Sequence, residues 1–232
     1  MTVYGQIDPN ILFPDSDGKP MADNTEQFRW IVLIKENLEI LFASNDNVFI
    51  AGDLLWYPIR SQLITPVAPD VMVVFGRPKG KRGSYRQWQE ENIPPQVVFE
   101  ILSPSNDSKD MDRKLEFYDT YGVDEYYLYD PESFQLNGWV RQNEHLTKLW
   151  QMDGWVSPHL GIKFATGLGE PIIYRPDGQR FLTSIELDQR AEQAELLLEQ
   201  ERQRAEQERQ RAEQLAEYLR SLGVDPNNLP PR

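Results

Sequence analysis

The sequence predicts an α/β or α+β domain in which a central mixed sheet is flanked by helices, followed by one long charged helix. Several short runs rich in Val, Ile, Leu, Phe and Tyr are typical of buried strands. These strand-like runs are 68–76, 97–102 and 123–131. Two segments with helical periodicity, 25–43 and 107–122, alternate with the runs and indicate helices packed on a sheet. From residue 184 to 222 the chain has no Gly or Pro and consists mainly of Ala, Glu, Gln, Arg and Leu.

The first elements follow from local signals. Residues 1–24 are rich in Pro, Asp and Gly and are expected to form an N-terminal arm. A helix is predicted from Thr25, with Thr25 as its cap and with one apolar face. That face is expected to hold Phe28, Ile31, Leu38 and Phe42. One or two strands are then expected within 48–59.

The middle of the domain alternates strands with one more helix. The strand within 68–76 ends at Gly76, and a polar loop separates it from the run VVFEIL at 97–102. The helix predicted over 107–122 has acidic residues in its first turn and Gly122 at its C-terminal stop. The strand over 123–131 is followed by QLNGWV and LTKLW, which predict an antiparallel pair. Shorter β-segments are expected up to about Phe181, so the domain is predicted to span 25–183.

The C-terminal segment 184–222 differs in kind from the domain before it. The motif RAEQ begins at residues 190, 204 and 211, which is seven-residue phasing. One heptad position holds Ala191, Leu198, Ala205, Ala212 and Leu219, and the other holds Leu187, Ala194, Glu201, Glu208, Leu215 and Leu222. This seam favours pairing with a second copy or with a partner helix. The alternative is a single solvated helix supported by Glu–Arg pairs. Residues 223–232 are expected to be a disordered tail.

Composition narrows the function classes. The 232-residue chain carries a formal net charge of −13, with 17 Lys+Arg against 26 Asp+Glu in residues 1–183. An acidic chain is no general nucleic-acid binder, so any contact with DNA must come from a local patch. The absence of cysteine excludes thiolate chemistry and disulfides and fits a cytoplasmic protein. No apolar run is long enough to cross a membrane, no secretory signal is expected at the N-terminus, and the two histidines lack the spacing of a metal-binding pair.

Two acids and one lysine stand at unusual places in this pattern. Glu100 lies in the middle of an apolar strand, and Asp70 opens the strand PDVMVVF. Because side chains alternate along a strand, the two carboxylates converge if the strands are neighbours in register. Lys114 falls on the core-facing stripe of the next helix, together with Met111, Leu115 and Tyr118. A lysine there needs an anionic partner, which Glu100 can supply.

These residues resemble the PD-(D/E)XK nuclease superfamily, which has the restriction-endonuclease-like fold. The stretches PDVMVVFG, VVFEILSPSN and KLEFYDTYGVDEYYLYDP, with the basic heptad-like tail, are more closely similar to the Uma family of putative restriction endonucleases. The resemblance covers roughly residues 25–182. The superfamily usually has lysine two residues after the second acid, where this chain has Leu102. The resemblance implies that the lysine has moved to the following helix, at Lys114.

The resemblance implies an endonuclease that hydrolyses DNA phosphodiester bonds with Mg²⁺, for which Mn²⁺ can substitute. Asp70, Glu100 and the Ile101 carbonyl are the implied metal ligands, and Lys114 orients or activates the attacking water. Asp53 or Glu36 are candidates for a third carboxylate, and Ser103 and Tyr118 are candidate supporting hydrogen-bond donors. Two alternatives stay open. In the first, Asp70, Glu100 and Lys114 form a purely structural ion network. In the second, the protein keeps the nuclease-like fold but serves as an assembly module through its C-terminal helix.

One segment is predicted to contact DNA. The loop GRPKGKRGSYRQW, residues 76–88, contains no acid and follows directly on the Asp70 strand. Its basic residues are Arg77, Lys79, Lys81, Arg82 and Arg86. Basic side chains beside Tyr85 and Trp88 suit a phosphate backbone with base stacking. A solvated loop is the alternative.

Overall fold

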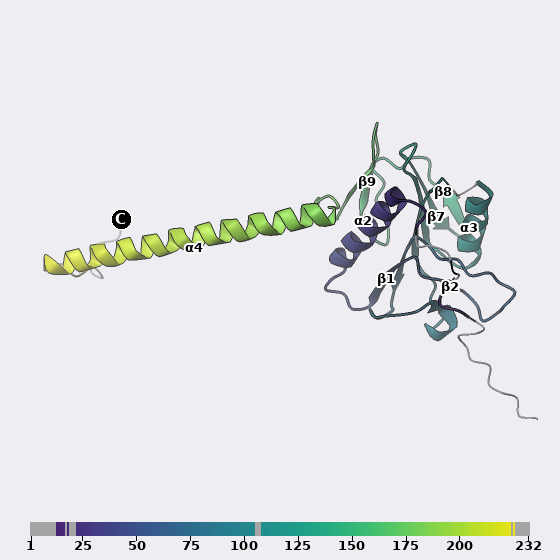
Figure 1. The fold of residues 1–232 in the computed structure, drawn as a ribbon, viewed down its shortest axis with the longest axis horizontal. Helices are drawn as coiled ribbons and strands as arrows, with labels where there is room; N and C mark the ends of the chain where they lie inside the picture. The colour runs from purple at the N-terminus through teal and green to yellow at the C-terminus, as the bar shows by residue number, and fades with distance from the viewer. Residues whose placement is uncertain (1–12, 17, 19–21, 105–107, 224, 226–232) are drawn as a thin grey trace, which may run out of the picture. The chain divides into compact units, whose positions relative to one another are not determined.

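The core of the molecule is a six-stranded mixed sheet (Figure 1). The computed structural model describes residues 13–16, 18, 22–104, 108–223 and 225. The strands, in their order across the sheet, are β1 (Val48–Gly52), β3 (Val71–Phe75), β5 (Val97–Ile101), β6 (Glu125–Asp130), β7 (Gln135–Gln142) and β8 (His145–Lys148). Neighbours are antiparallel except β5 and β6, which are parallel and are connected through helix α3 (Ser108–Thr120). The predicted α/β class with a mixed sheet is confirmed.

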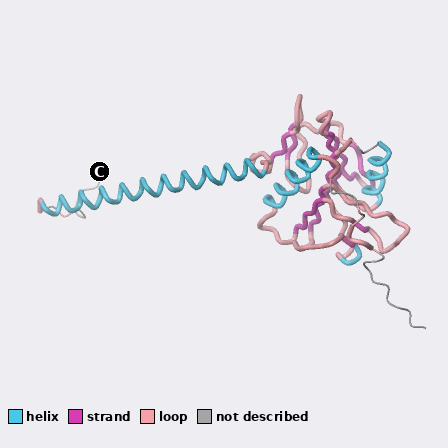
Figure 2. The backbone as a smooth tube through the Cα atoms, in the orientation of Figure 1, coloured by secondary structure: helices cyan, strands magenta, loops and turns pink. Residues whose placement is uncertain are grey.

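Two helices cover the two faces of this sheet, as the tube in Figure 2 shows. Helix α2 (Thr25–Leu41) buries Trp30, Ile31, Ile34 and Leu38 against one face, in a cluster with Val71, Val73, Val97 and Phe99. Helix α3 packs Tyr118 and Leu115 against the other face, in a cluster with Met72, Val74, Val98 and Tyr126. Successive residues of a strand point to opposite faces, so each strand contributes alternately to the two clusters. The face under α3 is the one that matters for the site.

The first helix corrects two details of the sequence prediction. Its N-cap is Asn24, whose side-chain oxygen accepts a hydrogen bond from the Gln27 amide at 2.8 Å, so Thr25 is the first helical residue. Phe28, which was expected on the apolar face, is 48% exposed. The buried position beside it is Gln27, a polar residue that the apolar periodicity does not single out.

Smaller elements complete the domain. Strands β2 (Trp56–Tyr57) and β4 (Tyr85–Arg86) form a parallel pair, and a 3₁₀ turn (Gln87–Gln89) follows β4. Strands β9 (Lys163–Ala165) and β10 (Ile172–Tyr174) form an antiparallel pair. The predicted antiparallel pairing of QLNGWV with LTKLW is confirmed by β7 and β8. Helix α3 ends before Gly122, whose φ of +90° is the left-handed conformation expected after a helix.

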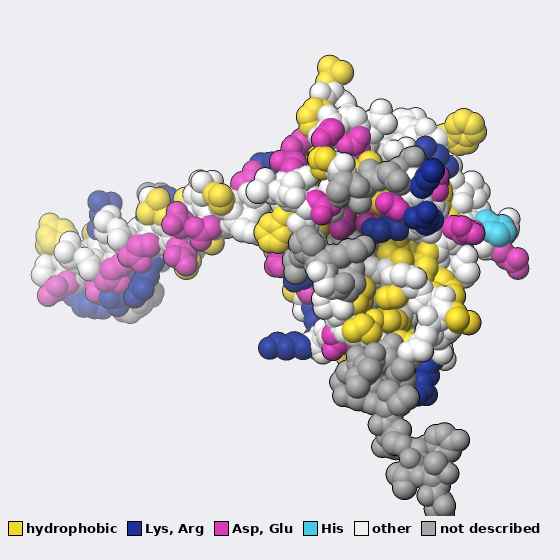
Figure 3. Space-filling view, turned by 45° about the vertical axis from the view of Figure 1, so that its right-hand side comes forward, with side chains coloured by type: hydrophobic (Ala, Val, Ile, Leu, Met, Phe, Trp, Pro, Cys, Tyr) yellow, Lys and Arg dark blue, Asp and Glu magenta, His cyan; other side chains and the backbone are white. Residues whose placement is uncertain are grey.

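The C-terminal helix α4 (Ser184–Ser221) belongs to a separate unit, since the chain divides into Met1–Phe181 and Leu182–Arg232. It begins with a capping box in which Thr183 and Glu186 bond each other's backbone amides. No described residue of α4 is buried, and acidic and basic side chains lie along it with apolar ones between them (Figure 3). Among the described residues, no helix combines the length and apolar composition of a membrane span. Most of the predicted N-terminal arm, the predicted helix start at Asp107 and most of the predicted tail lie outside the described residues.

Candidate active site

The register of two strands brings the two predicted acids together. Strands β3 and β5 are antiparallel neighbours in which Val71 is paired with Phe99 and Met72 with Val98. One step beyond this ladder, Asp70 lies opposite Glu100. Residues that face each other across an antiparallel pair point to the same side of the sheet. Both carboxylates therefore lie on the face under α3, and they are 6% and 2% exposed.

Helix α3 supplies the partners of Glu100. The Lys114 ammonium donates to one Glu100 oxygen at 2.7 Å, and the Tyr118 hydroxyl donates to the other. Lys114 and Tyr118 are one helical turn apart, so both side chains leave the same face of α3. Tyr118 is fully buried, while the Lys114 side chain keeps 25% of its surface exposed. The lysine thus connects the buried acids to solvent.

Asp70 is held by the backbone of the facing strand and by α2. The Ile101 amide donates to Asp70 Oδ2 at 2.6 Å. The Gln27 side-chain amide donates to the Ile101 carbonyl at 3.1 Å and lies 3.4 and 3.5 Å from the two Asp70 oxygens. Three oxygens therefore converge around one donor nitrogen. Sequence reasoning missed Gln27; its polar side chain between the buried positions of α2 is the signal that could have identified it.

The electrostatics of the pair is dominated by burial. Burial raises the pKa of Asp70 to about 8, with a further contribution from the negative charge of Glu100. Lys114, the Ile101 amide and Gln27 oppose this increase. Burial alone lowers the pKa of Lys114, but the charges of Glu100 and Asp70 outweigh it, so the Lys114 pKa is raised. One lysine thus faces two acids, and the site carries an excess of negative charge only when Asp70 loses its proton at alkaline pH.

A second buried tyrosine lies beside these groups. Tyr126 on β6 is fully buried, and its hydroxyl has no hydrogen-bond partner in the described part of the chain. Burial, followed by the charges of Glu100 and Asp70, raises the pKa of Tyr126, so the hydroxyl stays protonated. A buried hydroxyl without a partner costs free energy unless a ligand or water completes it. Nothing in the sequence distinguishes Tyr126 from the other tyrosines of β6.

The remaining predicted residues divide into near and distant ones. The negative charge of Asp53 contributes to the raised pKa of Lys114, which places Asp53 beside the site. Glu36 is exposed and its carboxylate is paired with Lys35 at 3.0 Å, so the structure does not bring it to the acid pair. Ser103 donates to Asp23 at 2.6 Å and supports neither carboxylate with this contact. Within the described ranges, no group of three or more His, Cys, Asp or Glu residues is arranged to hold a metal ion.

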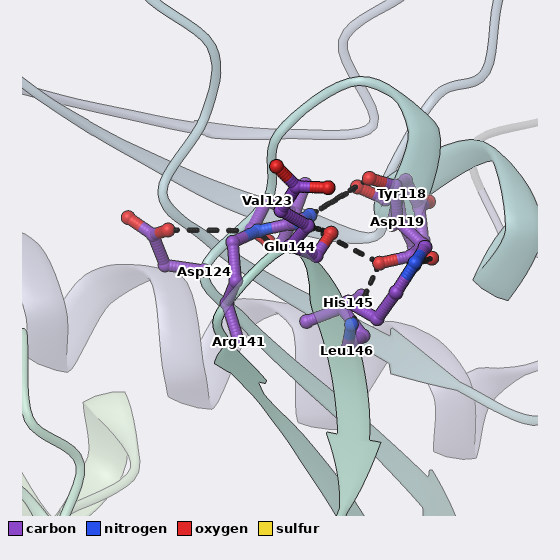
Figure 4. Close-up of polar contacts among 8 residues, drawn as sticks. All are labelled: Tyr118, Asp119, Val123, Asp124, Arg141, Glu144, His145 and Leu146. Atoms are coloured by element: carbon purple, nitrogen blue, oxygen red, sulfur yellow. Dashed lines mark hydrogen bonds and ion pairs between the residues drawn. The ribbon is translucent and has the colours of Figure 1, made fainter.

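The position of α3, and with it Lys114, is fixed at the helix C-terminus by Arg141 on β7 (Figure 4). Its guanidinium donates to the carbonyls of Asp119 and Val123 at 2.8 and 2.9 Å. The Asp119 carboxylate in turn accepts hydrogen bonds from Leu146 N at 2.6 Å and His145 Nδ1 at 2.9 Å. Arg141 therefore satisfies the Asp119 carbonyl, one of those that a helix end leaves unpaired, and ties α3 to the β7–β8 hairpin.

Four of the five bases in the loop predicted to contact DNA have partners within the protein. Arg77 and Arg82 both bind Glu90, at 2.9 and 2.7 Å. Lys79 donates to the Phe42 carbonyl at 2.8 Å, and Arg86 donates to the Phe13 carbonyl at 2.6 Å. Lys81 is exposed. The loop is thus held by its basic residues, and carboxylates within 4 Å offset most of its charge, namely Glu90, Glu91, Glu39 and Asp15.

Comparison with known proteins identifies the family. The family model of Uma2, described as "Putative restriction endonuclease", matches residues 25–162, more than half of the chain. The chain belongs to this family. A solved structure, described as a putative nuclease belonging to DUF820 from Anabaena variabilis ATCC 29413, matches at 15% identity and a TM-score of 0.43. That match covers 60% of this chain and 74% of the other. The search of curated proteins found no match.

Proposed function

We propose that this Uma2 family member is a Mg²⁺-dependent endonuclease that hydrolyses DNA phosphodiester bonds at Asp70, Glu100 and Lys114. The observation that carries the proposal is the buried pair of facing carboxylates with a single lysine between them and solvent. A structural ion network is expected to balance its charges, because unpaired buried charge is costly. Here two acids share one lysine, and the metal-free protein meets the imbalance by keeping a proton on Asp70, whose pKa burial raises to about 8.

The residues present suit a divalent cation. Mg²⁺ prefers oxygen ligands, and the Asp70 carboxylate and the Ile101 carbonyl converge within 3.5 Å of one nitrogen. Asp70, Glu100 and the Ile101 carbonyl would hold the ion, with the Gln27 amide giving up its contacts. Bound there, the ion would lower the pKa of a water and neutralise charge on the scissile phosphate. Its charge would also lower the pKa of Asp70, which burial and then the negative charge of Glu100 raise in the metal-free protein.

The side chains around the acids have separate tasks in this proposal. The Lys114 ammonium reaches solvent and can hold the attacking water or stabilise negative charge on the phosphate. The Tyr118 hydroxyl and the Ile101 amide hold Glu100 and Asp70 in fixed orientations, which reduces the reorganisation needed during the reaction. The unpaired Tyr126 hydroxyl is available to donate to a water within the site. Leu102, where the superfamily usually has lysine, leaves this role to Lys114.

The direct test is a Mg²⁺ titration of plasmid, linear and single-stranded DNA cleavage by the wild type beside Glu100→Ala and Lys114→Ala. We expect Mg²⁺-dependent cleavage by the wild type and a loss of about 100-fold or more in each variant. Equal cleavage by wild type and folded Glu100→Ala would show that a contaminant is responsible. Metal binding without any cleavage by the wild type would favour the alternative function, an inactive nuclease fold that serves as an assembly module.

For DNA contact we propose Lys81 as the base of the 76–88 loop that phosphate can reach without breaking a contact already made inside the protein. Lys81→Ser is expected to lower the slope of log affinity against log salt by about 0.7–0.9. Arg82→Ser is the matched control, since Arg82 binds Glu90 and stacks 3.9 Å from the centre of the Phe49 ring. Arg82→Ser should reduce the free energy of unfolding. An unchanged slope in Lys81→Ser would exclude the loop from DNA contact.

A further inference from the structure

Several exposed leucines at α4 lie on one heptad stripe, while Ile185, Leu196, Leu197 and Tyr218 are exposed outside it. Leu198, Leu215 and Leu222 are 70%, 59% and 60% exposed, and no described residue of the helix is buried. Single exposed leucines are common on protein surfaces, but leucines repeated on one stripe of a long helix require a covering surface. Intrahelical pairs such as Arg204–Glu208 at 3.3 Å and Arg209–Glu213 at 3.5 Å stabilise the helix without covering that stripe.

Two glutamates in the stripe decide the direction in which a second helix can lie. In a parallel pair of identical helices, equivalent positions face each other. Glu201 would then meet Glu201 of the other copy, and Glu208 would meet Glu208. Two like-charged layers, buried near the middle of the contact, oppose that arrangement. In an antiparallel pair the two heptad positions face one another instead, so glutamate need not meet glutamate.

We propose that α4 binds α4 of a second copy of this chain in an antiparallel pair. One register pairs Leu198 with Leu215, matches a large residue with alanine in its other four layers, and leaves no leucine opposite a glutamate. Its layers pair Ala191 with Leu222, Ala194 with Leu219, Leu198 with Leu215, Glu201 with Ala212, and Ala205 with Glu208, each with the second residue on the other copy. The register can be displaced by seven residues in either of two directions. One displacement brings Leu198 opposite Glu208, and the other brings Leu219 opposite Glu201. The shared length is roughly 48 Å.

The charges that flank the stripe fit the same arrangement. Glu201 faces Ala212, and the residue before Ala212 is Arg211, which borders the stripe. Glu208 faces Ala205, which follows Arg204. Each glutamate in the stripe therefore lies next to an arginine of the other copy, with only a small alanine directly opposite. Charged residues bordering a helical seam select partner and orientation in this way. This inference concerns assembly and is independent of the proposed nuclease activity.

Because the natural chain has no cysteine, introduced cysteines report the orientation directly. We would prepare full-length Leu198→Cys and Leu215→Cys and oxidise each variant alone and both together. An antiparallel pair gives a disulfide-linked dimer only in the mixture. Linkage within each variant alone would show a parallel pair and overturn the proposal. Absence of linkage in all three samples would overturn it as well.

The molar mass of the full chain in solution provides an independent test. Light scattering should give twice the 27.1 kDa of one chain for the wild type. Leu198→Asp/Leu215→Asp should weaken self-association by about 100-fold or more, because it places charge in two layers of the pair. Leu196→Asp, at an exposed leucine outside the stripe, should leave self-association unchanged. A wild type that is monomeric over a wide concentration range would overturn the proposal, as would equal effects of the two sets of substitutions.

Discussion

Two buried glutamates on opposite faces of the same sheet have contrasting surroundings. Glu125 on β6 is 1% exposed and lies on the α2 face, where it accepts hydrogen bonds from Tyr127, Ser157 and the His159 amide. All three donors are neutral. Glu100 on β5 is 2% exposed and lies on the α3 face, where its partners are a lysine and a tyrosine and its neighbour is a second acid.

The contrast shows that burial of an acid does not by itself indicate function. The donors around Glu125 satisfy its oxygens and attach the 157–160 turn to β6, which is a structural task. Around Glu100, in contrast, the protein places Asp70, a second acid that competes with Glu100 for Lys114 once it is ionised. Such clustered like charges are costly for folding and are typical of sites that bind a cation.

The largest expected effect is a difference between Glu100→Gln, which should lower DNA cleavage, and Glu125→Gln, which should lower the free energy of unfolding. Glu100→Gln should reduce Mg²⁺-dependent DNA cleavage by about 100-fold or more and change the free energy of unfolding by less than about 2 kcal/mol, because it also relieves repulsion with Asp70. Glu125→Gln places an amide donor against three donors and should reduce the free energy of unfolding by about 2–4 kcal/mol. Its folded fraction should keep cleavage within about threefold of wild type.

Chemical denaturation and cleavage assays on the same preparations measure both effects. If Glu125→Gln lost cleavage while it remained folded, the separation of a structural face from a functional face would be wrong. If Glu100→Gln kept full cleavage, the proposed role of Glu100 would be wrong, whatever its stability.

The next effect concerns the pH dependence of stability without metal. The folded-state pKa of Asp70 is raised to about 8, far above its ordinary value. The folded protein therefore keeps this proton where the unfolded chain loses it, so the free energy of unfolding should fall as pH rises from about 4 to about 8, by about 2–5 kcal/mol. Asp70→Asn should remove this dependence. The raised pKa of Lys114 acts in a separate, more alkaline window.

Mg²⁺ should restore the free energy of unfolding that the protein loses as pH rises. A cation that binds ionised Asp70 stabilises the folded state by mass action, and more strongly at pH 9 than at pH 6. Thermal denaturation with and without Mg²⁺ at the two pH values measures this difference. Equal stabilisation of the wild type and of Asp70→Asn would contradict a site at Asp70.

The smallest expected effect tests how α3 is positioned. Arg141→Lys removes most of the hydrogen bonds to the α3 C-terminus and should cost about 1–2 kcal/mol in the free energy of unfolding. Displacement of Lys114 should lower cleavage by about threefold to tenfold. His145→Ala is the matched control, because the His145 side chain is 80% exposed and shares only the Asp119 contact. Its effect on stability should stay below about 0.5 kcal/mol.

Much of the fold could be predicted from the sequence because its signals are local. Apolar runs predicted the strands β3, β5 and β6, and the odd placement of Lys114 on the α3 stripe predicted its anionic partner. The register that brings Asp70 opposite Glu100 could only be stated as a condition. Register depends on which strands pair, and no local property of either strand specifies that.

The rest of the site depends on contacts between distant segments. Gln27 reaches Ile101 from the first turn of α2, and the Tyr126 hydroxyl matters only because Glu100 and Asp70 lie nearby. The basic residues of the 76–88 loop show a case in which the sequence predicted more than the structure contains. Their composition indicated a free basic surface, but Glu90 binds two of them. Charge composition does not reveal pairing across a fold.

The parallel β5–β6 connection also has a consequence for the order of folding. Asp70 and Glu100 meet when the antiparallel β3–β5 ladder forms, whereas the Lys114 ammonium reaches them only when α3 packs onto the sheet. Until that moment the growing sheet carries two adjacent acids with nothing to neutralise them. Formation of the β3–β5 ladder should therefore be faster at mildly acidic pH, where one of the acids can hold a proton and the repulsion between them is relieved.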